Sequence, residues 1–409
     1  MARRLLAMLA AALLAGPAAA MAAPSPAPPD SAVAARGIAA FGLDLFRQVG
    51  RTQPGNLVMS PYSASVALTM TSAGARARTA LQMARVLRHD LPAARLRRAF
   101  GALQADLAAA GSGDVGRPLV RIANALWVQR GFAVRQAFLD ALRGDFGAHA
   151  EELDFRDPDA ARKAVNDWAA RQTDGVIPEV LRPPQPDPGT ALMLANAIYL
   201  KAEWARPFSH EATVPAPFTL ADGTRVEVPT MHGIDLRSYA RVGSVQAVQL
   251  GYRGGRLAML ALLPPKDGLA ALERTLDEPR LRRIVGALRP TRLDLAMPKI
   301  HLHSSSLDLI PALKRLGMTD AFDPDRADLS GIAPITAGNR LVVNLVVQEA
   351  DLAVDEKGTV AAAVTTVGVG PTSAPVAPLR LALERPFLLL IRDRRTGTPL
   401  FMARVADPR

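Results

Sequence analysis

The sequence predicts an α+β fold in which helices dominate the first third of the chain and antiparallel sheets the remainder. Apolar residues recur at helical spacing in several stretches before residue 110, the first of which starts at Asp30. After residue 118, short apolar or alternating runs rich in β-formers predict strands with helices between them. No long strand-poor gap marks a domain boundary after Pro29, and no fixed-period repeat occurs. We therefore expect one domain over residues 30–409.

Local signals define each element in chain order. Asp30 or Ser31 can cap the first helix, which is expected to end near Gly50, and a short strand is predicted at residues 56–59. The remaining helices are predicted at residues 63–72, 78–87, 91–109, 134–146, 157–173 and 306–316, and the remaining strands at residues 119–128, 190–200, 244–249, 257–263, 292–302 and 340–347.

Composition excludes several kinds of protein. Of 409 residues, 49% are hydrophobic and 21% are charged, which is typical of a globular chain that can bury a sizeable core. The absence of cysteine excludes disulfides, thiolate nucleophiles and cysteine-ligated metal sites. The formal charge of +11 is compatible with a polyanionic partner or with a genome that encodes arginine readily, because net charge governs non-specific binding rather than fold.

The first residues have the pattern of a secretory signal. Arg3 and Arg4 precede an apolar stretch at residues 5–14, and small residues that suit a signal peptidase come after it. The apolar stretch is shorter than the roughly 20 residues that a membrane-spanning helix needs, and no later run is long enough either, so no membrane association is expected. We expect residues 1–23 to be a signal peptide, residues 24–29 to be a Pro-rich spacer, and the mature chain to be exported, either extracellular or periplasmic.

One segment, residues 359–379, does not fit the rest of the pattern. It contains no charged and no aromatic residue. Its second half is rich in glycine and proline and is predicted to be a surface loop, whereas residues 359–367 are small or β-branched and could pair with an open sheet edge. Composition leaves two interpretations open: an edge strand with a Pro-rich connection or linker, or a loop that changes state about a hinge at residues 355–358.

Motifs over nearly all of the mature chain resemble those of the serpin family. Residues 194–208, Leu-Ala-Asn-Ala-Ile-Tyr-Leu-Lys-Ala-Glu-Trp-Ala-Arg-Pro-Phe, match a family signature almost residue by residue. Similar motifs lie at residues 56–63, 79–83, 166–168, 173–178, 297–299, 316–322, 328–332, 385–387 and 401–405. The resemblance implies the serpin fold, with helices packed on three sheets rich in antiparallel strands and an exposed reactive-centre loop at about residues 356–379.

This resemblance implies a suicide inhibitor of a serine protease rather than an enzyme. In serpins the protease attacks the loop, and after the acyl-enzyme forms the freed part of the loop inserts as a strand into the large sheet and deforms the protease. The expected partner is therefore a serine protease, and the inhibitor is expected to be a monomer. Two alternatives stay open: a non-inhibitory binding or carrier protein on the same fold, and a hydrolase on an unrelated α/β fold.

The resemblance also assigns roles within the loop. It places the hinge at Glu356, Gly358, Thr359, Ala361, Ala362 and Ala363. The usual family spacing, counted from Glu356, places the scissile bond between Thr372 and Ser373. Because residues 359–378 contain no arginine, lysine, aromatic, leucine, methionine or acidic residue, a trypsin-like target is disfavoured and an elastase- or subtilisin-like protease with a small-residue pocket is favoured.

A second set of residues corresponds to the region that controls opening of the serpin sheet. It comprises Ser60, Ser63, Asn196, Gln348 and Trp204. Gln348 stands where the family commonly has histidine, and an amide can also donate and accept hydrogen bonds. Trp204 is equally compatible with a large core aromatic.

Other signals for ligands are weak. The G-x-G-x-x-G match at residues 111–116 comes after a helix rather than a strand, so no dinucleotide is expected. His301 and His303 share one face of a predicted strand but lack a third ligand, and no metal or other cofactor is expected. An arginine-rich helix with Arg95, Arg97 and Arg98 could bind a polyanion, although a solvated helix face is the more ordinary interpretation.

Overall fold

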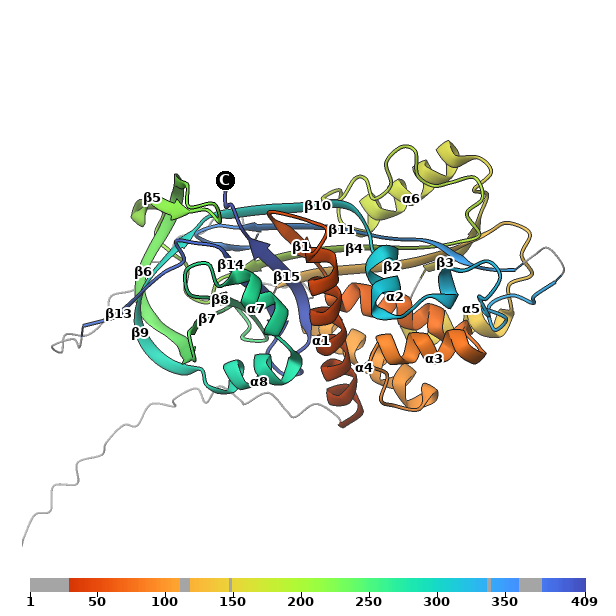
Figure 1. The fold of residues 1–409 in the computed structure, drawn as a ribbon, viewed down its shortest axis with the longest axis horizontal. Coiled ribbons are helices and arrows are strands. Elements are labelled where there is room, and N and C mark those ends of the chain that lie inside the picture. Colours follow the sequence, from red (N-terminus) through yellow and green to blue (C-terminus); the bar gives the residue numbers. More distant parts are fainter. Residues whose placement is uncertain (1–28, 111–117, 147–148, 337–339, 360–376) are drawn as a thin grey trace, which may run out of the picture.

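A six-stranded sheet runs through the middle of the molecule, with helices on both faces and a second sheet at one end (Figure 1). The structure is a computed structural model that describes residues 29–110, 118–146, 149–336, 340–359 and 377–409. The predicted signal peptide and residues 24–28 of the predicted spacer lie outside these residues. The first helix begins one residue earlier than expected, at Pro29, because proline is well tolerated in the first turn of a helix.

The helices of the first third confirm the predicted pattern. The described helices are α1 (Pro29–Gly50), α2 (Pro61–Gly74), α3 (Ala77–Val86), α4 (Ala93–Ala110), α5 (Gln136–Phe146), α6 (Pro158–Gln172), α7 (Leu269–Thr275), α8 (Glu278–Gly286) and α9 (Ile310–Leu316), with short 3₁₀ turns at His210–Ala212 and Asp320–Phe322. The helix predicted at residues 306–316 is shorter than expected, since Leu307 and Asp308 still pair with Gln348 and Val347 of a neighbouring strand.

The six-stranded sheet has the strand order β10-β11-β12-β4-β2-β3. Its strands are β2 (Leu119–Gln129), β3 (His149–Leu153), β4 (Leu192–Glu203), β10 (Ile300–Asp308), β11 (Val343–Val354) and β12 (Gly358–Thr359). Apolar residues on one face of β2 and β4 pack in the main core with α2. Residues on the other face pack against α6, where Trp127 and Trp168 meet edge to face.

The larger sheet has the order β1-β15-β14-β8-β7-β6-β9-β13, with β5 paired to β6. Its strands are β1 (Leu57–Met59), β5 (Thr213–Thr219), β6 (Arg225–Val242), β7 (Val245–Gly251), β8 (Leu257–Leu263), β9 (Arg289–Pro298), β13 (Leu379–Ala382), β14 (Phe387–Asp393) and β15 (Pro399–Val405). Hydrogen bonding thus joins the described strands into two sheets where three were predicted. The cause is β6, whose first part pairs with β5 and whose last part pairs with β7, while β9 pairs with its middle.

Between β9 and β10 the chain passes from the larger sheet to the six-stranded sheet through a single residue. The strand predicted at residues 292–302 is in fact two strands, β9 in the larger sheet and β10 in the six-stranded sheet, and Lys299 alone separates them. Its N–H donates to the carbonyl of Pro229 on β6 at 2.8 Å. Lys299 therefore marks one junction between the sheets.

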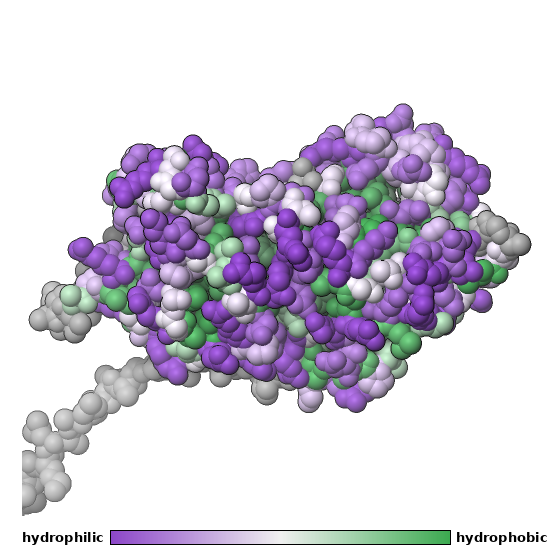
Figure 2. Space-filling model, viewed as in Figure 1, coloured by the Kyte–Doolittle hydropathy of each residue, from purple (hydrophilic) through white to green (hydrophobic). Residues whose placement is uncertain are grey.

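The exterior matches an ordinary globular chain. On the face seen in Figure 2, hydrophilic residues predominate and hydrophobic residues are visible mainly in the recesses between elements. Within the described ranges, no helix combines the length and apolar character that crossing a membrane requires.

We expect the close approach of α1 and α2 to depend on Gly42. A Cβ at Gly42 would lie 2.3 Å from the Cβ of Pro61, so Gly42→Ala should lower the free energy of unfolding by about 1–3 kcal/mol through overpacking. The matched control is Gly144→Ala in α5, where no heavy atom lies within 4 Å and alanine should raise stability by about 0.5–1 kcal/mol. Urea unfolding of both variants checks this, and equal stability would contradict it.

Candidate functional site

The six-stranded sheet contains a seam where β4 and β11 run parallel. Residues 343–350 of β11 pair with residues 192–198 of β4. Beyond them β12 lies between the two strands, and Thr359 pairs with Val354 on one side and with Ala202 on the other. Continued parallel pairing would place Val354 directly opposite Ala202, so Thr359 occupies a place between two potential neighbours. The strands therefore separate at this end, and we call the space between them the gap.

A tight turn carries the chain from β11 into the gap. The N–H of Asp355 donates to the carbonyl of Gly358 at 2.8 Å, and the carboxylate of Asp355 accepts the N–H groups of Lys357 and Gly358 at 2.8 and 3.1 Å. A Cβ on Gly358 would lie 2.0 Å from the carbonyl oxygen of Ala202, so only glycine fits. Three predicted hinge residues, Glu356, Gly358 and Thr359, lie here. The others, Ala361, Ala362 and Ala363, and the predicted bond Thr372–Ser373 lie outside the described residues.

Two stacked aromatic rings hold the turn and Thr359 in place. Thr359 is 1% exposed, and its hydroxyl lies 2.7 Å from the hydroxyl of Tyr252. The ring of Tyr252 stacks on Trp204 with a centroid distance of 4.5 Å. Trp204 in turn donates its indole N–H to the carbonyl of Asp355 at 2.9 Å and its backbone N–H to the carbonyl of Lys357 at 2.7 Å. Trp204 is thus a buried aromatic that also holds the turn at residues 355–358 in place.

Glu356 anchors the turn to the second sheet. Its carboxylate accepts the Thr213 hydroxyl at 2.8 Å and lies 3.1 Å from the Lys299 ammonium, while its carbonyl accepts the N–H of Phe208. Only 6% of Glu356 is exposed. Burial alone would raise its pKa, but hydrogen bonds from its own backbone N–H, Thr213 and Lys299, with the charge of Lys299, hold the pKa below the ordinary value.

A buried polar cluster crosses the seam further along. Gln348 accepts the N–H of Ser60 at 2.7 Å and donates to the carbonyl of Ser60 at 3.0 Å and to the side-chain oxygen of Asn196 at 3.4 Å. The side-chain oxygen of Asn124 accepts hydrogen bonds from Asn196 at 3.1 Å and from the Ser63 hydroxyl at 2.9 Å. The structure thus brings together Ser60, Ser63, Asn196 and Gln348.

One member of this cluster was missed by the sequence analysis. Asn124, which was not predicted, is a full member because it lies opposite Asn196 on β2, as Gln348 does on β11. An asparagine within the otherwise apolar run of residues 122–128 was the signal that could have identified it. Trp204, which was predicted for the sheet-opening region but not as a polar partner of Gln348, lies eight residues further along the chain than Asn196, about 26 Å away in an extended strand, and belongs to the gap.

Part of the seam is covered on its outer face. The side chains of α6 and of residues 177–181 pack against β4 and β11. The hydroxyl of Ser306 donates to the carbonyl of Val180 at 2.6 Å, and Arg182 lies 3.5 Å from Glu349 of β11. A strand that extended β12 along the seam would therefore pass beneath this cover.

The histidines and arginines considered as ligand sites have other partners. His301 lies 3.1 Å from Asp351, and His303 lies 2.9 Å from Glu349. The residues placed in the structure contain no group of three or more histidine, aspartate or glutamate side chains suited to a metal ion. Arg95 pairs with Asp30 and Arg97 pairs with Asp145 at 2.7 Å, whereas Arg98 has no ion pair among the described residues. Polyanion binding through these arginines stays a prediction.

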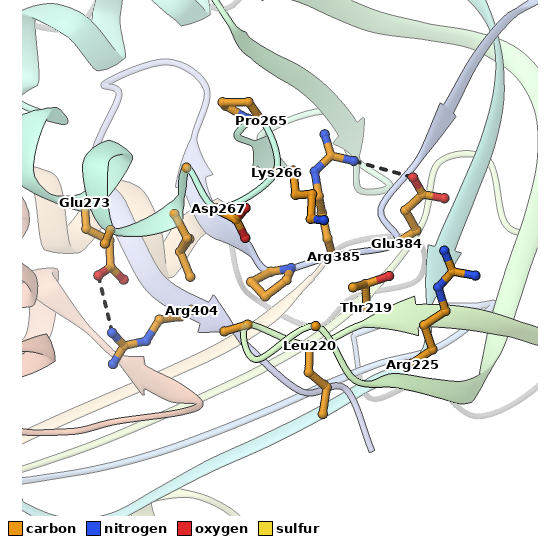
Figure 3. A pocket seen from close by; sticks show the side chains of 16 residues that line it. Thr219, Leu220, Arg225, Pro265, Lys266, Asp267, Glu273, Glu384, Arg385 and Arg404 are labelled. Atoms are coloured by element: carbon orange, nitrogen blue, oxygen red, sulfur yellow. Dashed lines mark hydrogen bonds and ion pairs between the residues drawn. The ribbon is translucent and has the colours of Figure 1, made fainter.

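A pocket of about 430 Å³ lies apart from the gap and was not indicated by the sequence (Figure 3). It is lined by the β5–β6 turn, the loop after β8 and residues 384–386. The guanidinium of Arg385 donates twice to the carbonyl of Pro264, at 3.1 and 2.9 Å, and lies 3.5 Å from Glu384. Arg404 lies 3.3 Å from Glu273 at the other end. Both signs of charge thus surround one cavity.

Comparison with known proteins shows the family. A family model described as Serpin (serine protease inhibitor) matches residues 36–408. The chain is 34% identical over 377 residues to an uncharacterized serpin-like protein of Thermococcus kodakarensis, covering 91% of this chain and 85% of that protein. It is 32% identical to the leukocyte elastase inhibitor of Sus scrofa, covering 90% and 97%. The chain belongs to the serpin family.

Solved structures confirm the fold. A thermophilic serpin, tengpin, in the native state superposes with a TM-score of 0.83 at 26% identity, covering 91% of this chain and 94% of that one. Human thyroxine-binding globulin in complex with its ligand has the same TM-score and identity, covering 93% and 99%. The fold is therefore that of serpins, a family that consists mostly of protease inhibitors but includes a thyroxine-binding globulin.

We expect Gln348 to be required for stability of the seam. Gln348→Ala removes the acceptor for the buried N–H of Ser60 and leaves a cavity, so the free energy of unfolding should fall by about 2–4 kcal/mol. Gln348→His should cost less and should introduce a pH dependence near pH 6.5 that the wild type lacks at this position. The control Gln136→Ala, an exposed residue on α5, should change stability by less than about 0.5 kcal/mol in urea unfolding.

We expect the hinge to loosen in acid through Glu356. Because its pKa is lowered in the folded state, its charge stabilises the fold above the ordinary carboxyl pKa near 4.3, and this stabilisation is lost as the pH falls through the lowered value. Glu356→Gln should therefore lower the thermal midpoint at pH 7 and flatten its decline below pH 5. Glu227→Gln, at an exposed position on β6, should match the wild type, and parallel pH profiles for all three proteins would contradict the assignment.

Proposed function

We propose that the protein is a covalent, loop-inserting inhibitor of a serine protease whose pocket accepts small side chains. The observation that carries the proposal is Thr359, which is already seated between β4 and β11 and antiparallel to both. A strand that continued from Thr359 would replace one parallel ladder with two antiparallel ladders. At roughly 0.5–1.5 kcal/mol for each hydrogen bond gained, about a dozen residues would contribute on the order of 10 kcal/mol.

The length of the seam suits the loop that would fill it. Continuing the register set by Thr359 opposite Ala202 brings residue 369 opposite Leu192, where β4 begins. The predicted scissile bond after Thr372 lies just beyond this point in the sequence. A strand freed by cleavage there can therefore extend along the whole of β4.

The chemistry of the loop also suits the seam. In the continued register, residue 365 falls opposite both Asn196 and Gln348, and the sequence has a threonine there. Its hydroxyl could replace the 3.4 Å hydrogen bond between the two amides, which is the longest in the cluster. Ala361 and Ala363 would face the main core beside Leu200 and Ile198, where small side chains enter most easily.

The target class rests on the loop sequence and on relatives. Residues 359–378 are small or β-branched apart from glycine and proline, which favours a protease of elastase or subtilisin type. The relative from Sus scrofa is named a leukocyte elastase inhibitor. We further propose that residues 1–23 direct export, so that the inhibitor acts as a monomer in the periplasm or outside the cell.

A non-inhibitory binding protein is the second candidate. The observation that favours it is the pocket of about 430 Å³, and a structural neighbour is a thyroxine-binding protein. A carrier of this kind would not require an insertable loop, whereas this chain has a hinge with a glycine at its closest contact and no charged residue in residues 359–379. Cleavage of the loop distinguishes the two candidates.

We expect the mature protein, mixed with pancreatic elastase or subtilisin, to form an adduct that survives denaturing electrophoresis. Mass spectrometry should find a released peptide that begins at Ser373, and the cleaved protein should melt at a higher temperature because the sheet gains a strand. Thr365→Arg should be cut without forming an adduct, because insertion would bury a charge, while the control Thr365→Ser should still inhibit. Cleavage of the wild type with neither adduct nor a rise in melting temperature favours the carrier.

A further inference from the structure

Two apolar side chains are exposed on β6 of the larger sheet, which is separated from β13 by β9 alone. Ile234 is 57% exposed and Leu236 is 52% exposed, and as residues i and i+2 of β6 they point to the same side. Adjacent large apolar residues with this exposure mark interaction surfaces more often than scattered single ones do. A role for them in protease binding rests on the proposed inhibitory function and adds a further contact with the same partner.

Strand register extends this surface across β9 and β13. Ile234 lies opposite Asp294, which lies opposite Arg380, and Leu236 lies opposite Arg292. Asp294 and Arg380 form an ion pair at 3.6 Å. Arg292 is exposed and has no ion pair among the described residues. We call the surface formed by these five residues the outer face.

The outer face lies beside the place where the reactive-centre loop rejoins the fold. Leu379, at the start of β13, is opposite Leu293 of β9, which is opposite Asp235 between the two apolar residues. Two strand spacings place β13 about 10 Å from β6. Because β13 is parallel to β9, the chain that leads into Leu379 comes from the end of the face where Arg292 and Leu236 lie.

A protease on the predicted bond has to sit close to this surface. Three residues lie between Ser373 and Ala377, a separation of four Cα–Cα steps, so Ser373 is within about 14 Å of Ala377 even in a fully extended chain. A protease domain of some 230 residues has a radius of gyration of about 17 Å. Its surface can therefore contact the outer face while its active site holds the loop.

We propose that the outer face is a second contact surface for the target protease. The matching protease surface, next to its active-site cleft, carries an apolar patch for Ile234 and Leu236 and an acidic side chain for Arg292. Desolvating two apolar side chains strengthens the initial encounter complex, and the unpaired guanidinium steers association. The contact precedes acylation, so it governs the rate of inhibition and not the yield of adduct.

The test measures both the second-order rate constant and the stoichiometry of inhibition for each variant, using whichever of pancreatic elastase and subtilisin forms the adduct. The double variant Ile234→Ser/Leu236→Ser should inhibit about tenfold more slowly with an unchanged adduct yield. The control Leu81→Ser alters a residue that is 69% exposed on α3, far from β6, and should stay within twofold of the wild type (Figure 1). Arg292→Glu should slow inhibition at low salt and lose most of that effect at high salt.

Three results would overturn the proposal. An unchanged rate constant in the double variant means that the protease does not touch this face. A wild-type dimer in sedimentation velocity that the double variant abolishes assigns the face to a second copy of the chain. If the wild type forms no adduct with either protease, both the inhibitory function and the contact on the outer face are contradicted. This result differs from that of a normal inhibitor whose rate constant the double variant leaves unchanged, which contradicts the contact alone.

Discussion

The structure depends on the way in which β4 and β11 are held apart at one end and together at the other. At the gap, Thr359 occupies the place between Val354 and Ala202, and the stacked rings of Trp204 and Tyr252 fix it there. Further along, the amides of Asn196 and Gln348 bridge the same two strands. In the proposed mechanism, this separation at one end and the 3.4 Å polar bridge further along mark the part of the sheet where the freed loop would enter.

Much of this arrangement could be predicted from sequence, because it depends on local patterns. Helical spacing in the first third, the run of residues 194–208 and the glycine at position 358 all pointed to the correct elements. The split of residues 292–302 into β9 and β10 could not be predicted, because the apolar pattern continues through Lys299 while the pairing partner changes. Register between distant strands decides such cases, and a single sequence does not contain it.

The site was predictable to a similar degree. The family pattern located Glu356, Gly358 and Thr359, but their partners Thr213 and Tyr252 come from strands or loops distant in sequence and have no local signature. Asn124 joins the polar cluster only through its register opposite Asn196. A residue whose role is to meet another across a sheet is recognised only when the topology is known.

The ion pair between Glu356 and Lys299 fixes the point about which the predicted hinge would turn. Lys299 lies between β9 of the larger sheet and β10 of the six-stranded sheet, so Glu356 is tied to a point where the two sheets meet and which a strand entering the gap would not need to move. In the proposed mechanism the segment that moves begins only after this fixed point. Its length from Thr359 to Thr372 is about 43 Å in an extended strand, and it sets how far along the sheet an attached protease is carried. A longer or shorter segment would change the distance over which the protease is carried without changing the fixed point at Glu356.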